Sequence, residues 1–346
     1  MKATFALIPD KAQATLDTEE LDASMLAPGQ ILVQAERTVM SGGTELAAFT
    51  ALSKSVYKKD GWNAYPWRPG YGLVGRVVAA APERTRGLEA GDRIFCFGKH
   101  ASLQIYDLDS PKPFRAAFRI GEDLDAEAAV VARLALVSMT ALQMSEVRPG
   151  HTVLVLGMGL VGNFAAQLYR IAGARVFVHD PVAGRRDVAR GVGLEVLEGD
   201  DPIQAVRDAT DGRGVDIAVD AAGLGPVCAM CVEACAPYGQ VVLLGSPRPP
   251  FETNLTAVFN RIHMQWLTVR GALEWRLPPY RVPGGGPSVE ENLERVHDWI
   301  RSGALKTEGL VSHVIQPEAL LSAYRGMLDD KEHYHGVIVD WSQHTP

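Results

Sequence analysis

Three glycines at a fixed spacing are the residues whose pattern most directly indicates chemistry. Gly157, Gly159 and Gly162 end the stretch Val-Leu-Val-Leu-Gly-Met-Gly-Leu-Val-Gly, with the spacing G-x-G-x-x-G after an apolar run. Gly157 permits a tight turn, Gly159 lets a pyrophosphate approach the backbone, and Gly162 lets the next helix pack closely on the strand. The free N–H groups that begin this helix, predicted over residues 163–172, would face the phosphates. The stretch therefore predicts a dinucleotide-binding turn.

An acid at the end of the next apolar run supports this interpretation. Asp180 closes the stretch Ala-Arg-Val-Phe-Val-His-Asp, about twenty residues beyond the glycines, where a carboxylate can accept hydrogen bonds from the adenosine ribose. The alternative is a helix N-cap before Pro181. Asp180 would repel a 2′-phosphate, whereas Arg185 and Arg186 could attract one. We expect NAD as the cofactor and leave NADP open.

Composition limits the class of protein. The chain has 346 residues, 47% of them apolar, and a net charge of −7, which fits two domains and argues against a nucleic-acid partner. The apolar run at the N-terminus is too short for a signal peptide, and we expect that no segment of the chain approaches a membrane span. Four cysteines fit a reducing cytoplasm better than a disulfide framework.

The elements that must position the glycine turn change in character along the chain. Short strands are predicted at Ile31–Ala35, Gly75–Ala80 and Ile94–Phe97, separated by turn signals. An alanine-rich helix follows over residues 126–142. Strands and helices then alternate, with strands at 153–156, 174–180, 215–220, 240–245 and 267–271 and helices at 203–210 and 228–235. This alternation predicts an α/β fold with a doubly wound parallel sheet.

The last part of the chain departs from that alternation. Pro278–Pro287 is predicted to be a loop, because it is rich in proline and glycine. A helix over 289–302, a strand over 309–315, a helix over 317–329 and a closing strand over 336–341 follow. Cys228, Cys231 and Cys235 are predicted to share one helix face and to pack there as small apolar residues rather than bind a metal.

The order of these parts resembles the medium-chain dehydrogenase/reductase superfamily, of the zinc-type alcohol dehydrogenase-like kind, over nearly the whole chain. The resemblance rests on Gly91-Asp92-Arg93-Ile94-Phe95, on the lead-in Val147–Val153, on Gly214–Gly223 and on His313-Val314-Ile315. It implies a β-rich GroES-like catalytic domain (residues 1–137), a Rossmann NAD(P)-binding domain (138–274) and a return to the catalytic domain (275–346). It also implies a homodimer or homotetramer formed through the Rossmann edge. The cofactor-binding residues that it implies are Thr140, Gly157, Gly159, Leu160, Val161, Gly162, Asp180, Arg185, Ala222, Gly245, Gly271 and Ala272.

The chain departs from the family where a catalytic zinc would be held. The stretches that carry the family's three ligands read Gly42-Gly43-Thr44-Glu45, Gly70-Tyr71-Gly72 and Leu136 ahead of Thr140-Ala141. Glycine, tyrosine and leucine cannot supply the three protein ligands that such a zinc needs. The four-cysteine lobe for a structural zinc is also missing. We therefore expect a member without a bound metal.

Without a metal, protein groups must balance charge as hydride moves, and four residues are candidates. Thr44 matches the family's hydroxyl that binds the substrate oxygen, or it forms a local turn or cap. Glu45 is a base or simply an acid in a first helical turn. Tyr71 is a proton donor or an aromatic plug in the volume left by the metal. His100 is a proton shuttle or an ordinary loop histidine.

Substrate contacts are predicted in an aromatic and basic loop, residues 54–68. Tyr57, Trp62 and Trp67 could stack on a ring or sugar, with Lys58, Lys59 and Arg68 attracting an anion, or the loop could be an anchored surface or subunit contact. Trp275 begins a segment that could close opposite it as a lid.

Together these features predict a cytoplasmic, zinc-independent oxidoreductase. It would transfer a hydride between NAD(H) and a carbonyl or secondary alcohol of a small, ring-containing substrate, sugar-like or polar aromatic. One alternative is an enoyl- or quinone-type reductase of a conjugated carbon–carbon double bond. The other is a non-catalytic nicotinamide-binding protein.

Overall fold

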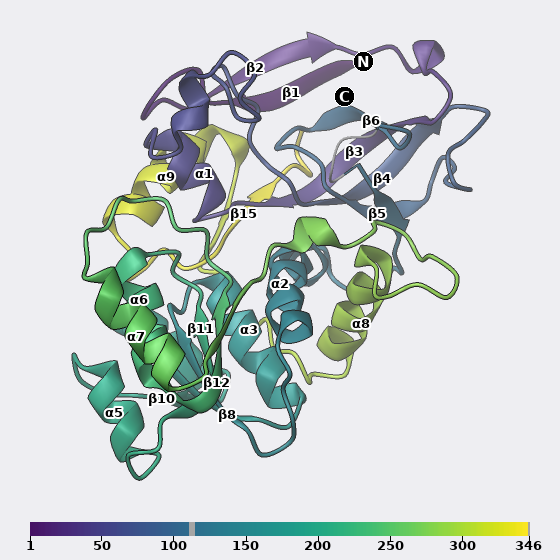
Figure 1. Ribbon diagram of the computed structural model, residues 1–346. Helices are drawn as coiled ribbons and strands as arrows, with labels where there is room; N and C mark the ends of the chain where they lie inside the picture. The colour runs from purple at the N-terminus through teal and green to yellow at the C-terminus, as the bar shows by residue number, and fades with distance from the viewer. Residues whose placement is uncertain (111–114, 345–346) are drawn as a thin grey trace.

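The N-terminal and C-terminal parts of the chain share one mixed sheet of seven strands in the computed structural model, which describes residues 1–110 and 115–344 (Figure 1). The order is β14-β15-β3-β4-β5-β7, and β6 also pairs with β3. The strands are β3 (Gln30–Val39), β4 (Leu73–Ala80), β5 (Arg93–Cys96), β6 (Leu103–Asp107), β7 (Ala117–Arg119), β14 (His313–Ile315) and β15 (Val337–Asp340). A separate antiparallel pair joins β1 (Lys2–Leu7) to β2 (Thr15–Glu20). Because β15 pairs antiparallel with β3, the C-terminal part of the chain returns to the sheet that the N-terminal part forms from β3 onward.

A second sheet of six parallel strands has the order β10-β9-β8-β11-β12-β13. The strands are β8 (Thr152–Leu156), β9 (Arg175–His179), β10 (Glu195–Val196), β11 (Val215–Asp220), β12 (Cys235–Leu243) and β13 (Thr268–Gly271), and the helices between them are α3 (Leu160–Ile171), α4 (Ala183–Gly191), α5 (Pro202–Asp208), α6 (Gly225–Ala234) and α7 (Leu255–Met264). The strand order reverses at β8, because β9 lies on one side and β11 on the other. Ligands of doubly wound sheets bind at the carboxyl ends of such strands. This sheet and the mixed sheet confirm the predicted fold class.

One long helix, α2 (Ala126–Met144), connects the two sheets. Asp125 caps its N-terminus by accepting from the backbone N–H groups of Glu127 and Ala128. By length and composition α2 is apolar enough to cross a bilayer, so the prediction that no segment approaches a membrane span is wrong on that criterion. Two thirds of its most apolar window is buried, however, and it packs against α3 and α8 (Val289–Arg301), as a core helix does. The helix runs unbroken through the predicted boundary at residue 137, and the domain limits stay predictions.

Shorter elements complete the mixed-sheet unit. They are α1 (Thr44–Phe49), α9 (Leu320–Asp329) and the 3-10 turns Ala23–Met25, Lys54–Tyr57, Glu274–Arg276 and Pro317–Ala319. Phe49 of α1 stacks on Tyr324 of α9 at 5.0 Å between ring centres, so these distant segments share one core.

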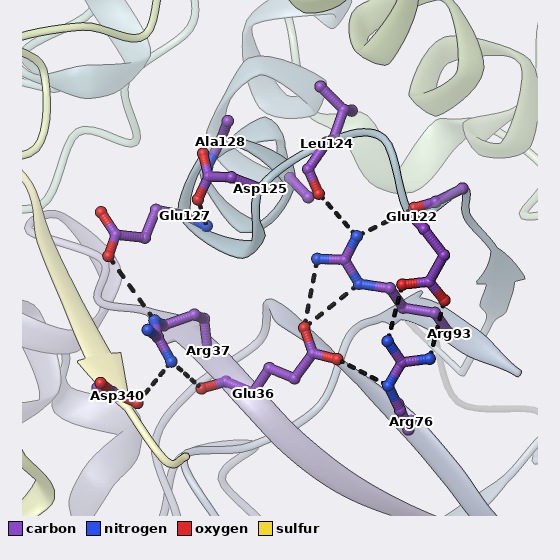
Figure 2. Close-up of polar contacts among 12 residues, drawn as sticks. Glu36, Arg37, Arg76, Arg93, Glu122, Leu124, Asp125, Glu127, Ala128 and Asp340 are labelled. Atoms are coloured by element: carbon purple, nitrogen blue, oxygen red, sulfur yellow. Dashed lines mark hydrogen bonds and ion pairs between the residues drawn. The ribbon is translucent and has the colours of Figure 1, made fainter. Parts of the chain in front are cut away.

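An ion-pair network ties the mixed sheet to the start of α2 (Figure 2). Arg93 is buried, and it donates to the carbonyls of Gly121 and Leu124 as well as pairing with Glu36. Arg37 pairs with Asp340 of β15 and lies near Glu127 of α2. Strands from both ends of the chain and the helix that leads to the second sheet are therefore held at one corner.

The prediction for the three cysteines needs a correction. Cys228 and Cys231 lie on α6, but Cys235 is the first residue of β12, because the helix ends at Ala234. Cys231 and Cys235 are both buried in the apolar layer under the parallel sheet, and the Cys228 thiol donates to Asp220.

Candidate active site

The glycine turn between β8 and α3 has the geometry that its spacing predicts. Gly157 has φ +98°, a conformation that strongly favours glycine, and a Cβ there would lie 3.0 Å from the Ala222 nitrogen. A Cβ on Gly162 would lie 1.8 Å from the Gly157 carbonyl oxygen, so only glycine lets α3 approach the turn. A Cβ on Gly159, by contrast, would meet no atom within 4 Å. The backbone at Gly159 therefore faces open space at the helix N-terminus, where Leu160 and Val161 form the first turn.

Further predicted cofactor contacts gather at the carboxyl ends of the neighbouring strands. Gly245 approaches the turn after β11 so closely that a Cβ would lie 2.2 Å from the Gly223 nitrogen. Ala272, just after Gly271 and the end of β13, donates to the Leu243 carbonyl. Thr140 of α2 is almost fully buried, and its hydroxyl has no hydrogen-bond partner among the described residues. A buried hydroxyl without a partner carries a desolvation cost that a polar ligand would remove. These features fit a dinucleotide along this edge.

Asp180 lies at the end of β9, and both of its carboxylate oxygens accept hydrogen bonds from the protein backbone. One carboxylate oxygen accepts from the backbone of Met158 at 2.7 Å, and the other accepts from Val182 at 2.9 Å. Asp180 therefore connects the glycine turn to the residue before α4, but it is not the predicted N-cap, because Val182 holds that position. Each carboxylate oxygen can accept more than one hydrogen bond, so a ribose contact stays a prediction.

The arginines after Asp180 are held by protein groups. Arg185 lies 3.5 Å from the Asp180 carboxylate, and Arg186 donates to the carbonyls of Asp180 and Pro181. The first backbone N–H groups of α4 donate to the carboxylate of Glu332, at 2.7 Å from Gly184. The Glu332 carboxylate thus already lies at the N-terminus of α4, and its negative charge disfavours a 2′-phosphate there. Glu332 follows α9, and no motif in the sequence pointed to it.

At the mixed sheet, Tyr71 forms a hydroxyl pair with Ser41. The Tyr71 hydroxyl lies 2.9 Å from Ser41 Oγ, and Ser41 Oγ also accepts from the backbone N–H of Thr44 at 3.2 Å. Two hydrogen bonds therefore arrive at the Ser41 oxygen, and the Ser41 proton has no acceptor among the described residues. The side chain of Thr44 is partly exposed beside the pair, and Gly42 and Gly43 present bare backbone.

A buried arginine lies against the Tyr71 ring. The Arg133 guanidinium of α2 is 4.1 Å from the ring centre, donates to the Tyr71 carbonyl at 2.9 Å and forms a two-pronged ion pair with Glu274. Burial raises the pKa of the Tyr71 phenol, and the Arg133 charge acts in the opposite direction. The phenol is therefore protonated at neutral pH and acts as a donor.

Glu45 and His100, predicted as catalytic, are paired with each other instead of facing open space. Both are fully buried, and His100 Nε2 lies 3.1 Å from the Glu45 carboxylate. Tyr324 donates to the same carboxylate, and the other His100 nitrogen meets Thr38 at 2.7 Å. Glu45 also accepts from the backbone N–H of Ser41 at 3.0 Å. The predicted roles of Glu45 as a base and of His100 as a proton shuttle are not supported by this geometry, because both side chains are fully buried, and Glu45 instead holds the backbone of Ser41.

The aromatic loop divides into buried and exposed members. Trp67 is buried in the core and its backbone bridges to Ile8, so the predicted stacking of Trp67 on substrate is not supported. Arg68 pairs with Glu19 and lies over the Phe5 ring. Tyr57 and Trp62 are exposed, and Trp275 is 50% exposed just after Glu274, so substrate contact by these three stays a prediction.

Sequence reasoning missed Ser41, Arg133 and Glu274. Arg133 carried one signal: it is the only charged residue between Glu127 and Glu146 in an otherwise apolar helix. A buried charge in such a helix requires a partner, but the partner, Glu274, lies more than a hundred residues away in the chain.

The residues around Tyr71 do not fit a catalytic zinc. The family's ligand positions hold Gly42, Tyr71 and Leu136, and Leu136 is buried in the core. In the described part of the chain, no three His, Cys, Asp or Glu side chains converge as a metal site.

Comparisons with known proteins agree with this architecture. Residues 161–281 match the family described as zinc-binding dehydrogenase. The chain is 28% identical to 2-desacetyl-2-hydroxyethyl bacteriochlorophyllide A dehydrogenase of Cereibacter sphaeroides, over 99% of both chains. It is 24% identical to L-threonine 3-dehydrogenase of Pyrococcus furiosus, over 89% of this chain and 90% of that protein. Galactitol-1-phosphate dehydrogenase from Escherichia coli has the same fold, with a TM-score of 0.80 at 17% identity over 97% of this chain and 99% of that one.

Proposed function

Because this chain belongs to the zinc-type alcohol dehydrogenase-like group of the medium-chain dehydrogenase/reductase superfamily, and is thus an NAD(P)-dependent dehydrogenase or reductase, we propose a specific reaction for it. The enzyme transfers a hydride between NAD(H) and a carbonyl or secondary alcohol of a ring-containing, sugar-like or polar aromatic substrate, without zinc. The observation that carries the proposal is the Tyr71–Ser41 hydroxyl pair beside Arg133, at the place where relatives hold a metal.

The cofactor lies along the carboxyl edge of the parallel sheet. The backbone at Gly159 and the start of α3 receive the pyrophosphate, and Asp180 receives the adenosine ribose. The buried Thr140 hydroxyl offers a hydrogen bond toward the nicotinamide end. When bound, the nicotinamide supplies or accepts the hydride. Asp180 and Glu332 together favour NAD over NADP, because both carboxylates oppose a 2′-phosphate.

The hydroxyl pair supplies the proton that accompanies the hydride. Ser41 Oγ accepts from Tyr71 and from the backbone of Thr44, so the Ser41 proton is the one available to a substrate oxygen. As negative charge develops on that oxygen, Ser41 donates and Tyr71 can replace the proton. Arg133 stabilises the negative charge that then reaches the phenol. Glu45 and His100 hold the Ser41 turn in place.

Zinc-independence is part of the proposal. A zinc ion in these enzymes polarises the substrate oxygen, and the donors around Tyr71 and Ser41 perform that task by hydrogen bonding. The Tyr71–Ser41 hydroxyl pair supports this role, because it can donate a hydrogen bond to a substrate oxyanion.

A substrate screen tests the proposal. Purified protein is mixed with NADH and aromatic ketones, keto-sugars or enones, and with NAD and the corresponding alcohols, while nicotinamide absorbance is followed. Turnover of ketones and alcohols is expected. Turnover of enones alone would identify the double-bond reductase instead, and NADH binding without any turnover would identify a non-catalytic binding protein.

We propose a homodimer formed through the β13 edge of the parallel sheet. Strand β13 is the outermost strand, and α7 beside it has no buried residue. Trp266 and Tyr238 stack at 5.1 Å between ring centres, although 63% and 72% of their surfaces are exposed. Apolar surface of this kind is typical of a subunit contact. Light scattering should give twice the chain mass, and Trp266→Glu should lower it; a monomeric wild type would contradict this assignment.

A cytoplasmic location is proposed from the cysteines. All four are free, and three of them are buried, as expected in a reducing compartment.

A further inference from the structure

Arg248 is a half-buried arginine that has no counter-ion among the described residues. It lies in the loop Ser246-Pro247-Arg248-Pro249-Pro250, which follows β12 at the carboxyl edge of the parallel sheet. Its guanidinium has no hydrogen bond or ion pair to any described residue, whereas Arg133 is paired with Glu274. The loop begins directly after Gly245, which lies against Gly223 at the predicted cofactor edge, and the Tyr71 phenol acts electrostatically on the Arg248 guanidinium.

The loop that carries Arg248 is stiff and firmly seated. Three of its five residues are prolines, which fix φ and remove conformational freedom. A Cβ on Gly225 would lie 2.6 Å from the Phe251 side chain, and a Cβ on Gly223 would lie 2.7 Å from the Ser246 carbonyl oxygen. The loop is therefore packed on the turn after β11 at both of its ends. The backbone at Arg248 is therefore fixed before a ligand arrives, so binding an anion there needs to order only the side chain.

An unpaired charge in a partly buried position is costly, and an ion pair removes that cost. Arginine is suited to planar, two-pronged contacts with carboxylate and phosphate groups. Arg133 already has Glu274 as its negative partner. Near Tyr71, the guanidinium that has no negative partner among the described residues is therefore that of Arg248. The cofactor pyrophosphate is expected at Gly159, in the middle of the dinucleotide, so the nicotinamide ribose separates it from the nicotinamide and Tyr71.

We infer that Arg248 binds an anionic group of the substrate, a carboxylate or a phosphate ester, and so holds the reacting carbonyl beside Ser41 and Tyr71. The inference rests on the proposed oxidoreductase function and adds the substrate class to it. An anion at Arg248 lies near the Tyr71 phenol and so keeps it protonated, which preserves its role as a donor.

The test compares three probes of similar shape: 4-acetylbenzoate, 4-acetylphenyl phosphate and the neutral 4-acetylbenzamide. Dissociation constants are measured by calorimetry at fixed ionic strength, with free enzyme and with the enzyme–NADH complex, and NADH oxidation is followed in parallel. The variants are Arg248→Gln and Arg248→Lys. Arg175→Gln is the matched control, because it removes an equal charge from an exposed residue already paired with Glu195.

Wild type and Arg175→Gln should bind at least one anionic probe more tightly than the amide. The anion that they prefer distinguishes a carboxylate site from a phosphate site. Arg248→Gln should weaken the binding of that anion by roughly ten- to a hundredfold, as expected for the loss of a hydrogen bond between charged groups. The affinity for the amide should change by less than about threefold. Arg248→Lys should retain part of the preference. Affinity for NADH should be unchanged in all variants.

Equal binding of acid and amide by wild type, no binding of any probe, or an anion preference that survives in Arg248→Gln would overturn the inference. A loss of NADH affinity in Arg248→Gln would also overturn it, because the guanidinium would then belong to the cofactor site. Failure of the wild type to bind NADH would refute the proposed function instead, while the probes on free enzyme would still report on Arg248.

Discussion

Replacing Tyr71 by phenylalanine separates a proton donor from an aromatic plug. The change keeps the ring, so its 4.1 Å contact with the Arg133 guanidinium and its packing should survive. It removes the 2.9 Å hydrogen bond to Ser41 Oγ. Ser41 keeps the backbone N–H of Thr44 as a donor, so its oxygen is not left without a partner.

The structure sets the expected magnitudes of the two effects. Loss of one neutral hydrogen bond should lower the free energy of unfolding by about 1 kcal/mol. If the phenol replaces the proton that Ser41 gives to the substrate, kcat should fall by about a hundred- to ten-thousandfold, the usual contribution of general acid catalysis. If the phenol only orients Ser41, about 1 kcal/mol of transition-state stabilisation is lost, and kcat should fall roughly fivefold.

The assay is kcat for the best substrate from the screen, with NADH affinity and Tm measured on the same preparations. Ser41→Ala is the companion variant, because it removes the group that contacts the substrate oxygen and should lower kcat at least as much. An unchanged kcat in Tyr71→Phe, with Tm and NADH affinity also unchanged, would refute the donor role and leave Tyr71 as a plug.

Two further predictions concern cofactor choice and acid stability. Asp180→Ala should weaken NADH binding by roughly ten- to a hundredfold and reduce the preference for NADH over NADPH. Asp180→Asn should keep part of the NADH affinity, because its side-chain oxygen can still accept from the Met158 backbone. A wild type that binds NADPH more tightly than NADH would show the NAD assignment to be wrong. Burial lowers the pKa of His297 from 6.5 to about 4, so neutral His297 stabilises the fold above pH 6.5, and roughly 3 kcal/mol should be lost as the pH falls toward 4. Urea unfolding should show a smaller acid loss in His297→Gln than in wild type, and equal losses would contradict the role of this imidazole.

The fold was predictable because its signals are local. The glycine spacing at Gly157, the β-branched runs and the turn residues each specify their own element, and the alternation of strands and helices specifies a parallel sheet. The prediction was wrong where the chain changes from helix to strand without a turn residue or other local signal. Cys235 continues the helical spacing of Cys228 and Cys231, but it pairs in β12 because the sheet outweighs the local pattern.

The candidate site was only partly predictable, because most of its contacts join distant segments. Tyr71 stood out as a substitution at a family ligand position, but its partners Ser41 and Arg133 come from other elements. Glu45 and His100 are hydrogen-bonded to each other and fully buried. Nothing in the sequence around either residue shows that its side chain is buried instead of exposed to a substrate. Arg248 could not be singled out from the sequence, because only the positions of the described residues show that none of them pairs with it.

Metal content, measured together with activity, tests the central claim most directly. Protein purified without chelators is analysed for zinc, and NADH oxidation is then measured before and after dialysis against a strong chelator and after zinc is restored. Metal-free transfer predicts far less than one zinc per chain and the same kcat in all three samples, because Tyr71, Ser41 and Arg133 provide the donors and the charge. One tightly held zinc per chain, lost together with activity and restoring it on return, would contradict the account.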